Sequence, residues 1–117
     1  MSASAENLLR LCVQRHNEAV KTGKLDPLAS LFAETAIIRF EGIAFGPLRG
    51  PAAILNGFQQ HPPDDALIID AVASDDRSAR CPYRWARDPN AIAGSLEIDV
   101  ENGLITSLVI SVATAMF

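Results

Sequence analysis

Two strand-like segments near the C-terminus, 91–100 and 104–113, are separated by the pair Asn102-Gly103. Asn and Gly tolerate the positive backbone angles that a tight hairpin needs. We therefore predict that the chain ends in two antiparallel strands. Two further segments, 66–74 and 78–87, are also predicted to be strands; in the second, Ala79, Cys81, Tyr83 and Trp85 alternate on one face. The second half of the chain is thus expected to form a sheet.

The first half of the chain contains three predicted helices. The first lies between Ser4, a possible N-cap, and Gly23, a natural C-terminal stop. A short second helix is expected to have Asp26 as its N-cap, and a third starts at Pro51. The apolar face of the first helix is given by residues at helical spacing, which are Leu9, Cys12, Val13, His16 and Val20.

The segment Thr35–Glu41, between the second and third helices, alternates apolar and polar residues and is predicted to be a strand. Segments 66–73 and 104–113 are apolar on both faces, so both faces of the sheet need a cover. Helices are expected on one face. A second subunit is expected on the other, because Ile105 and Val109 would otherwise be exposed there. The chain is therefore predicted to be an α+β protein and a homodimer.

Length and composition limit the classes of protein that the chain can belong to. A chain of 117 residues with 49% hydrophobic residues predicts one domain, 1–117. A net charge of -4 without a run of Lys or Arg argues against a nucleic-acid partner. No membrane span or secretory pattern is visible, and the expected location is the cytoplasm. Cys12 and Cys81 are predicted to be reduced thiols. No metal-ligand spacing is present, and no cofactor is expected.

Several strings resemble a known family. They are Gly23 followed by LDPLASLFAETAIIRF at 25–40, GPLRGPAAI at 46–54, and the closing hairpin. With this order of elements, the chain resembles a compact member of the NTF2-like superfamily, in the branch of SnoaL-like polyketide cyclases and ketosteroid isomerases. The resemblance implies a cystatin-like fold, in which a strongly curved mixed sheet wraps around the first helix to form a cone. A small apolar molecule is the ligand that such a cone implies.

Ketosteroid isomerases also resemble this chain in the strand CPYRW, Cys81–Trp85. They place a tyrosine of the first helix, a carboxylate base and a protonated carboxylic acid in the cone. The corresponding positions here are His16, Phe40 and Ser95, and none of the three residue types matches. The isomerase mechanism needs a base and two donors for an oxyanion, so the resemblance does not carry that mechanism to this chain.

His16 and Tyr83 are the predicted catalytic residues. His16 lies on the apolar face of the first helix, which directs its ring into the cone, where a neutral imidazole can exchange a proton near physiological pH. Tyr83 alternates with Cys81 and Trp85 on one strand face and offers a hydroxyl donor. The alternative is ordinary core packing, with His16 held by a carbonyl or a water. The predicted ligand-binding residues are Ile38, Phe40, Phe58, Cys81, Trp85 and Ser95.

Other polar residues are expected to lie outside the cone. Asp70 interrupts an apolar run, and we favour an exterior position in which it pairs with Arg80 or Arg84. An interior position would instead make it a general base or a partner of His16. His61, in a Pro-rich loop, is predicted to be solvated.

Two classes of function follow from the sequence. The first is a cofactor-free isomerase, cyclase or dehydratase that acts by proton transfer on an apolar, oxygenated substrate. The second is a non-catalytic ligand-binding or dimerisation module. A second titratable group next to His16 in the cavity would favour the enzyme.

Overall fold

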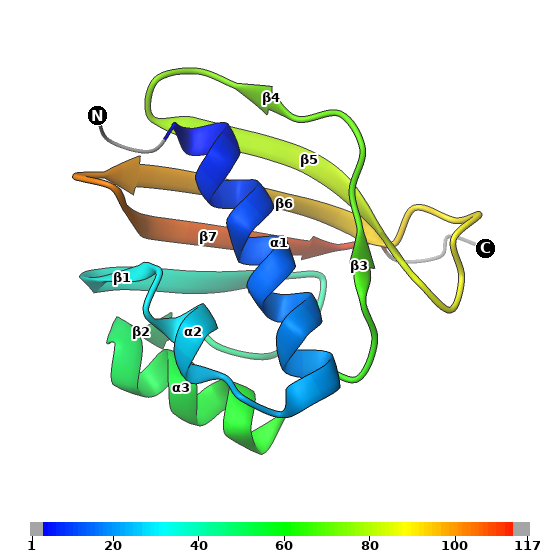
Figure 1. Ribbon diagram of the computed structural model, residues 1–117, viewed down its shortest axis with the longest axis horizontal. Helices are drawn as coiled ribbons and strands as arrows, with labels where there is room; N and C mark the ends of the chain where they lie inside the picture. Colours follow the sequence, from blue (N-terminus) through cyan, green and yellow to red (C-terminus); the bar gives the residue numbers. More distant parts are fainter. Residues whose placement is uncertain (1–3, 114–117) are drawn as a thin grey trace.

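The computed structural model describes residues 4–113. In this range α1 lies across one face of a curved sheet, and α2 and α3 lie toward the β1–β2 edge of that sheet (Figure 1). This arrangement confirms the predicted α+β class. The helices and strands in chain order are α1 (Ala5–Thr22), α2 (Asp26–Ala29), β1 (Phe32–Glu41), β2 (Leu48–Arg49), α3 (Gly50–Gln60), β3 (Leu67–Ile68), β4 (Ala73–Ser74), β5 (Ser78–Trp85), β6 (Gly94–Glu101) and β7 (Leu104–Val112).

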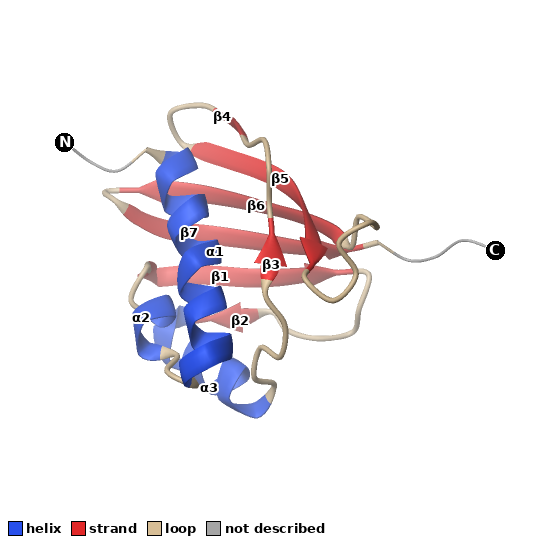
Figure 2. Cartoon of the chain, turned by 45° about the vertical axis from the view of Figure 1, so that its right-hand side comes forward, coloured by secondary structure: helices blue, strands red, loops and turns tan. Residues whose placement is uncertain are grey.

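The strands form one mixed sheet in the order β2-β1-β7-β6-β5-β3, and β4 also pairs with β5 (Figure 2). The pairing of β1 with β7 is parallel, whereas all the other pairs of described strands are antiparallel. The hairpin between β6 and β7 is confirmed. Asn102 and Gly103 have φ angles of 53° and 77°, in the left-handed region that the sequence predicted for them.

Both predicted ends of α1 are confirmed. The Ser4 hydroxyl accepts a hydrogen bond from the Asn7 backbone N–H at 3.1 Å, and Gly23 takes a left-handed conformation with φ 74°. The buried apolar face of α1, between these two ends, packs on β5 and β6. The large side chains that are almost completely buried in the core are Leu9, Leu28, Ile38, Ile54, Ile98 and Ile105.

The second helix begins one residue earlier than predicted. Asp26 is the first residue of α2, and Leu25 occupies the N-cap position without a side-chain hydrogen bond. The helix is short because β1 already begins at Phe32, whose buried side chain belongs to the sheet. The third helix begins at Gly50, next to the predicted Pro51.

The prediction of one continuous strand at 66–74 is wrong. The segment pairs with β5 at two separate places, with Ile68 opposite Arg84 and Ala73 opposite Arg80. Five steps along the edge segment therefore correspond to four steps along β5. One extra residue must leave the ladder, as in a β-bulge. The pairing of this segment with β5 is therefore interrupted between β3 and β4.

The prediction that Ile105 is exposed on the outer face is also wrong. Val100 pairs with Ile105 and Asp99 pairs with Ser107, so Thr106 is an extra residue in β7. Such a bulge reverses the alternation of side chains. Ile105 is consequently 0% exposed in the core, and Val109 remains as the partly exposed apolar residue of the predicted pair.

None of the helices in the described part of the chain is both long enough and apolar enough to cross a lipid bilayer.

Candidate functional site

A cavity of about 260 Å³ lies between α1 and the inner face of the sheet. It is lined mainly by apolar side chains, with a few polar groups, which is the usual composition of a small-molecule site. The helices contribute Cys12, Val13, His16, Leu28 and Phe58; the strands contribute Phe32, Phe40, Leu67, Tyr83, Trp85, Leu96, Leu108, Ile110 and Val112; and the loops contribute Ile43, His61, Pro62, Pro63 and Asp64.

His16 is half-buried on the cavity wall. Its Nδ1 lies 3.0 Å from Oδ1 of Asn17, and its ring centroid lies 6.2 Å from that of Trp85. Burial lowers the pKa of His16 below its ordinary value, although the hydrogen bond to Asn17 and the charges of Asp65 and Asp64 oppose this effect. The imidazole is therefore neutral at pH 7 and can accept a proton.

Tyr83 reaches the same cavity from β5 and is 2% exposed. Its ring packs edge-on against Trp85, with 5.5 Å between the ring centroids. Burial raises the pKa of Tyr83, so the hydroxyl keeps its proton and is able to donate a hydrogen bond to a ligand. Together with His16 this provides one proton acceptor and one hydrogen-bond donor in largely apolar surroundings.

Three of the predicted ligand-binding residues, Phe40, Phe58 and Trp85, line the cavity. The other three do not. Ile38 and Cys81 are buried in the core, with 0% and 3% of their surface exposed, but they are not part of the cavity wall.

Ser95 is exposed on the outer face of the sheet, so the prediction that it lines the cone is wrong. Its neighbour Leu96 points into the cavity instead. Side chains alternate along a strand, and a shift of one residue in the comparison with the isomerases therefore moves a position to the opposite face.

Two polar residues at the cavity mouth were not predicted from the sequence. His61, the residue after α3, is exposed as expected but also lines the cavity, as does Asp64. The His61 ring lies edge-on to Phe45, with 4.8 Å between centroids, and Phe45 lies 4.9 Å from Phe40. The inward position of Phe58 on α3 was the only signal that the following loop would lie close to the pocket.

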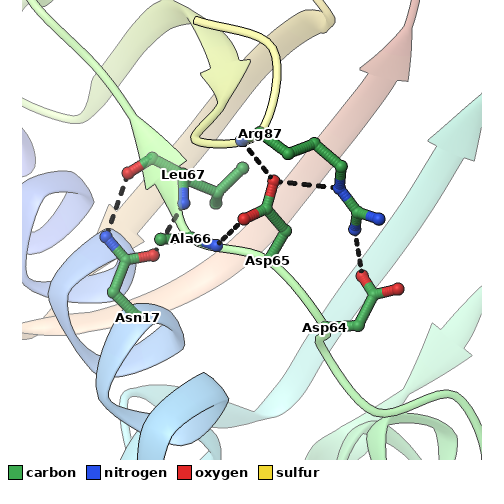
Figure 3. A network of polar contacts seen from close by, with 6 residues as sticks. All are labelled: Asn17, Asp64, Asp65, Ala66, Leu67 and Arg87. Atoms are coloured by element: carbon green, nitrogen blue, oxygen red, sulfur yellow. Dashed lines mark hydrogen bonds and ion pairs between the residues drawn. The ribbon is translucent and has the colours of Figure 1, made fainter.

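The loop beside the mouth is held by a network of polar contacts (Figure 3). Asp65 accepts hydrogen bonds from the backbone N–H and the Nε of Arg87 at 2.9 and 3.1 Å, and Nη2 of Arg87 donates to Asp64 at 2.8 Å. These bonds lower the pKa of Asp65, chiefly through the backbone N–H of Arg87. The network connects the loop after α3 to the loop after β5 and so fixes one side of the mouth.

Asp70 lies outside the cavity, as the favoured interpretation predicted. Its carboxylate, 72% exposed, forms an ion pair with Arg84. Both cysteines are free thiols, and burial raises the pKa of Cys12 to about 12, so this thiol remains protonated on the cavity wall. Among residues 4–113, no group of three His, Cys, Asp or Glu side chains is arranged to hold a metal ion.

Comparison with known proteins identifies the family of this domain. A family model described as a SnoaL-like domain matches residues 13–108, most of the chain. The chain belongs to the SnoaL-like family. No curated protein matches it.

Solved structures confirm the fold of this SnoaL-like domain. A Methylobium petroleophilum protein of unknown function with a cystatin-like fold has a TM-score of 0.75 at 19% identity, covering 100% of this chain and 80% of the other. A proposed ketosteroid isomerase from Kribbella flavida has a TM-score of 0.69 at 17% identity, covering 94% and 81%. A computationally designed 17-OHP binder has a TM-score of 0.65 at 14% identity, covering 92% and 91%. At these identities the similarity establishes the NTF2-like, cystatin-like fold.

Proposed function

We propose that this SnoaL-like protein binds a small, largely apolar carbonyl compound in the cavity and moves a proton next to the carbonyl group, without a cofactor. The observation that carries the proposal is the presence of His16 and Tyr83 on the wall of one apolar cavity. His61 and Asp64 also line this cavity, at its exposed mouth, and these further titratable groups support an enzyme over a binding module.

The proposed reaction has two proton transfers. The neutral His16 imidazole takes a proton from the carbon next to the carbonyl, and the Tyr83 hydroxyl donates a hydrogen bond to the oxygen as negative charge develops there. The imidazolium then returns the proton to the same or a neighbouring carbon. Isomerases, cyclases and dehydratases can all use such an enolate intermediate, and the similar fold of the proposed Kribbella ketosteroid isomerase supports this class.

The size of the cavity limits the ligand. Its volume of about 260 Å³ is slightly below the roughly 300–1,000 Å³ of common ligand pockets. An engineered apolar cavity of about 150 Å³ holds benzene. We therefore expect a ligand with one or two rings.

The ketone 2-tetralone, which has two fused rings and acidic C–H groups beside the carbonyl, is a suitable probe. Proton NMR in D₂O measures how fast these hydrogens exchange for deuterium. The protein should accelerate the exchange, and His16→Leu should abolish the acceleration. Tyr83→Phe should reduce it by about 10² or more, the scale of one lost oxyanion donor. Asn56→Ala, an exposed change on α3, is the control. Exchange at the buffer rate with the wild-type protein would contradict the catalytic proposal.

A non-catalytic binding protein is the second candidate. The observation that favours it is the aromatic ring of Phe40 on the cavity wall, at the position that the sequence resemblance pairs with the carboxylate base of ketosteroid isomerases. Trp85 is the chain's only tryptophan and lines the cavity, so its fluorescence reports binding directly. A saturable change in this fluorescence with 2-tetralone, without accelerated exchange, would identify a binding protein.

The homodimer and the cytoplasmic location stay predictions. With Ile105 buried, the case for a dimer through the outer sheet face rests on the partly exposed Ile37 and Val109. Sedimentation at micromolar concentration should give twice the chain mass, and a strict monomer would contradict the dimer. Cell fractionation tests the location.

A further inference from the structure

Asn17, the residue after His16 on α1, forms a two-point contact with the backbone of β3 (Figure 3). Its Nδ2 donates to the Leu67 carbonyl at 3.0 Å, and its Oδ1 accepts from the Leu67 N–H at 2.8 Å. The side chain therefore pairs with an exposed strand edge in the way that another backbone amide would.

This contact determines which way the Asn17 amide faces. If the oxygen and nitrogen were exchanged, the NH₂ group would face the Leu67 N–H and the oxygen would face the Leu67 carbonyl. Both contacts would then be repulsive. Oδ1 is consequently the atom that lies 3.0 Å from Nδ1 of His16. An amide oxygen only accepts hydrogen bonds, so Nδ1 must carry the proton in this contact.

We infer that Asn17 is a positioning residue that holds His16 as the Nδ1-protonated tautomer, so that Nε2 is the proton acceptor presented to the cavity. The inference deepens the proposed function and rests on it for its role in proton transfer. The hydrogen bond at one ring nitrogen determines the state of the other, as it does for histidines at metal sites.

The surroundings of Nε2 agree with this role. Within residues 4–113 Nε2 has no hydrogen-bond partner, and no side-chain nitrogen or oxygen in that range is both fully buried and unpartnered. Nε2 is therefore accessible, and His16 lines the cavity. The titratable groups around that cavity are Cys12 on α1, Tyr83 on β5, and His61 and Asp64 at the mouth, and the charge of Asp65 also acts on His16.

The tautomer also defines the chemical class of the ligand. An unprotonated Nε2 accepts a hydrogen bond or a proton, so the cavity should favour molecules that bring a hydroxyl group or an acidic C–H to His16. Two probes of similar shape test whether the cavity prefers a ligand that donates a hydrogen bond. 2-Naphthol carries an O–H donor, whereas 2-methoxynaphthalene has only an acceptor. We expect 2-naphthol to bind at least tenfold more tightly, as followed through Trp85 fluorescence, and this preference should disappear in His16→Leu.

The tautomer itself is measured on the ligand-free protein. A long-range ¹H–¹⁵N correlation spectrum distinguishes the protonated from the unprotonated nitrogen of each histidine, and His16→Leu assigns the signals. At pH 7.5 we expect Nδ1 of His16 to be the protonated nitrogen. A protonated Nε2 would overturn the inference, whatever the result with 2-tetralone.

Two variants at Asn17 separate positioning from a merely structural role. Asn17→Asp keeps an oxygen acceptor for Nδ1, so the tautomer should persist, and the added charge should raise the His16 pKa by about one unit or more. Asn17→Ala removes the acceptor, so both tautomers should appear and exchange of 2-tetralone should fall about tenfold or more. Asn56→Ala is the matched control on an exposed helix position.

These measurements distinguish failure of the inference from failure of the proposed function. An Nδ1-protonated His16 without accelerated exchange would support the positioning role of Asn17 and contradict the catalytic proposal. Alternatively, the wild-type protein could accelerate the exchange of 2-tetralone while a folded Asn17→Ala variant keeps the same His16 tautomer and the same exchange rate. That result would support catalysis and overturn the positioning role of Asn17. If Asn17→Ala does not fold, the tautomer in the wild-type spectrum and the pKa of His16 in Asn17→Asp still decide whether Asn17 positions His16.

Discussion

The two faces of the sheet use the same strands for different purposes. The inner face carries fully buried side chains such as Ile38 and Ile98 and, farther along, the wall of the cavity. On the outer face, Arg39, Val109, Glu97 and Arg80 lie opposite one another in a row across β1, β7, β6 and β5. Burial of apolar surface stabilises the fold, so substitutions should have large effects on one face and small effects on the other.

The comparison also shows where polar groups acquire a specific role. On the outer face a charged side chain is solvated, and its exchange for another polar residue should change little. The few polar groups of the inner face each need a partner or a ligand, because an unpaired buried polar group is costly. His16 is bonded to Asn17 on one side and open to the cavity on the other.

The largest contrast is expected within β6. Ile98→Ala removes a side chain that is 0% exposed and should lower the free energy of unfolding by about 2–5 kcal/mol. Its neighbour Glu97 points outward, and Glu97→Ala should change that free energy by no more than about 0.5 kcal/mol. Urea denaturation measures both. Equal effects would mean that the two faces do not differ as described.

A smaller effect is expected where the inner face has no room for a side chain. A Cβ on Gly94 would lie 1.8 Å from the Ser111 carbonyl oxygen, which belongs to the backbone of the paired strand and cannot move aside by a rotamer change. Gly94→Ala should therefore destabilise the protein by about 1–3 kcal/mol in thermal or urea unfolding. Ser95→Ala, one residue along on the outer face, is the control. If Gly94→Ala left the free energy of unfolding unchanged, the two paired strands would have to separate easily at this position.

His16 should make stability depend on pH. The folded pKa lies below the ordinary value of 6.5, so the unfolded chain binds the proton first as the pH falls. The free energy of unfolding should therefore decrease as the pH falls from about 6.5 to the folded pKa. His16→Leu should remove this part of the slope, and Asn56→Ala should keep it. An unchanged slope in His16→Leu would contradict the predicted burial of the imidazole.

The smallest effect is expected at the ion pair between Asp70 and Arg84. The carboxylate is 72% exposed, so water screens the pair and Asp70→Asn should lower stability by about 0–1 kcal/mol. A double-mutant cycle with Arg84→Gln isolates the pair energy, and raised salt should reduce it. A coupling above about 2 kcal/mol would show that this exterior pair is structurally important.

Local patterns in the sequence were sufficient for much of the fold. The caps at Ser4 and Gly23, the Asn102-Gly103 turn and the alternation Ala36, Ile38, Phe40 depend on interactions between residues close in the chain, and the structure contains all of them. The same patterns placed His16 on the face of α1 that reaches the cavity. The order of elements and the matching strings were enough to indicate the SnoaL-like family, which the family model confirms.

Tertiary structure alone decided the points at which distant segments meet. The bulge at Thr106 turns Ile105 into the core, and the extra residue between β3 and β4 divides one predicted strand into two, because register depends on the partner strand. Ser95 is a different case, because the alternation along β6 already places it on the outer face, and only the comparison with the isomerases, shifted by one residue, had put it in the cone. His61 and Asp64 reach the cavity through the path of a loop, and Asn17 meets Leu67 across 50 residues of sequence. A local pattern records which face a residue prefers, whereas the partner on that face is determined by how the whole chain packs.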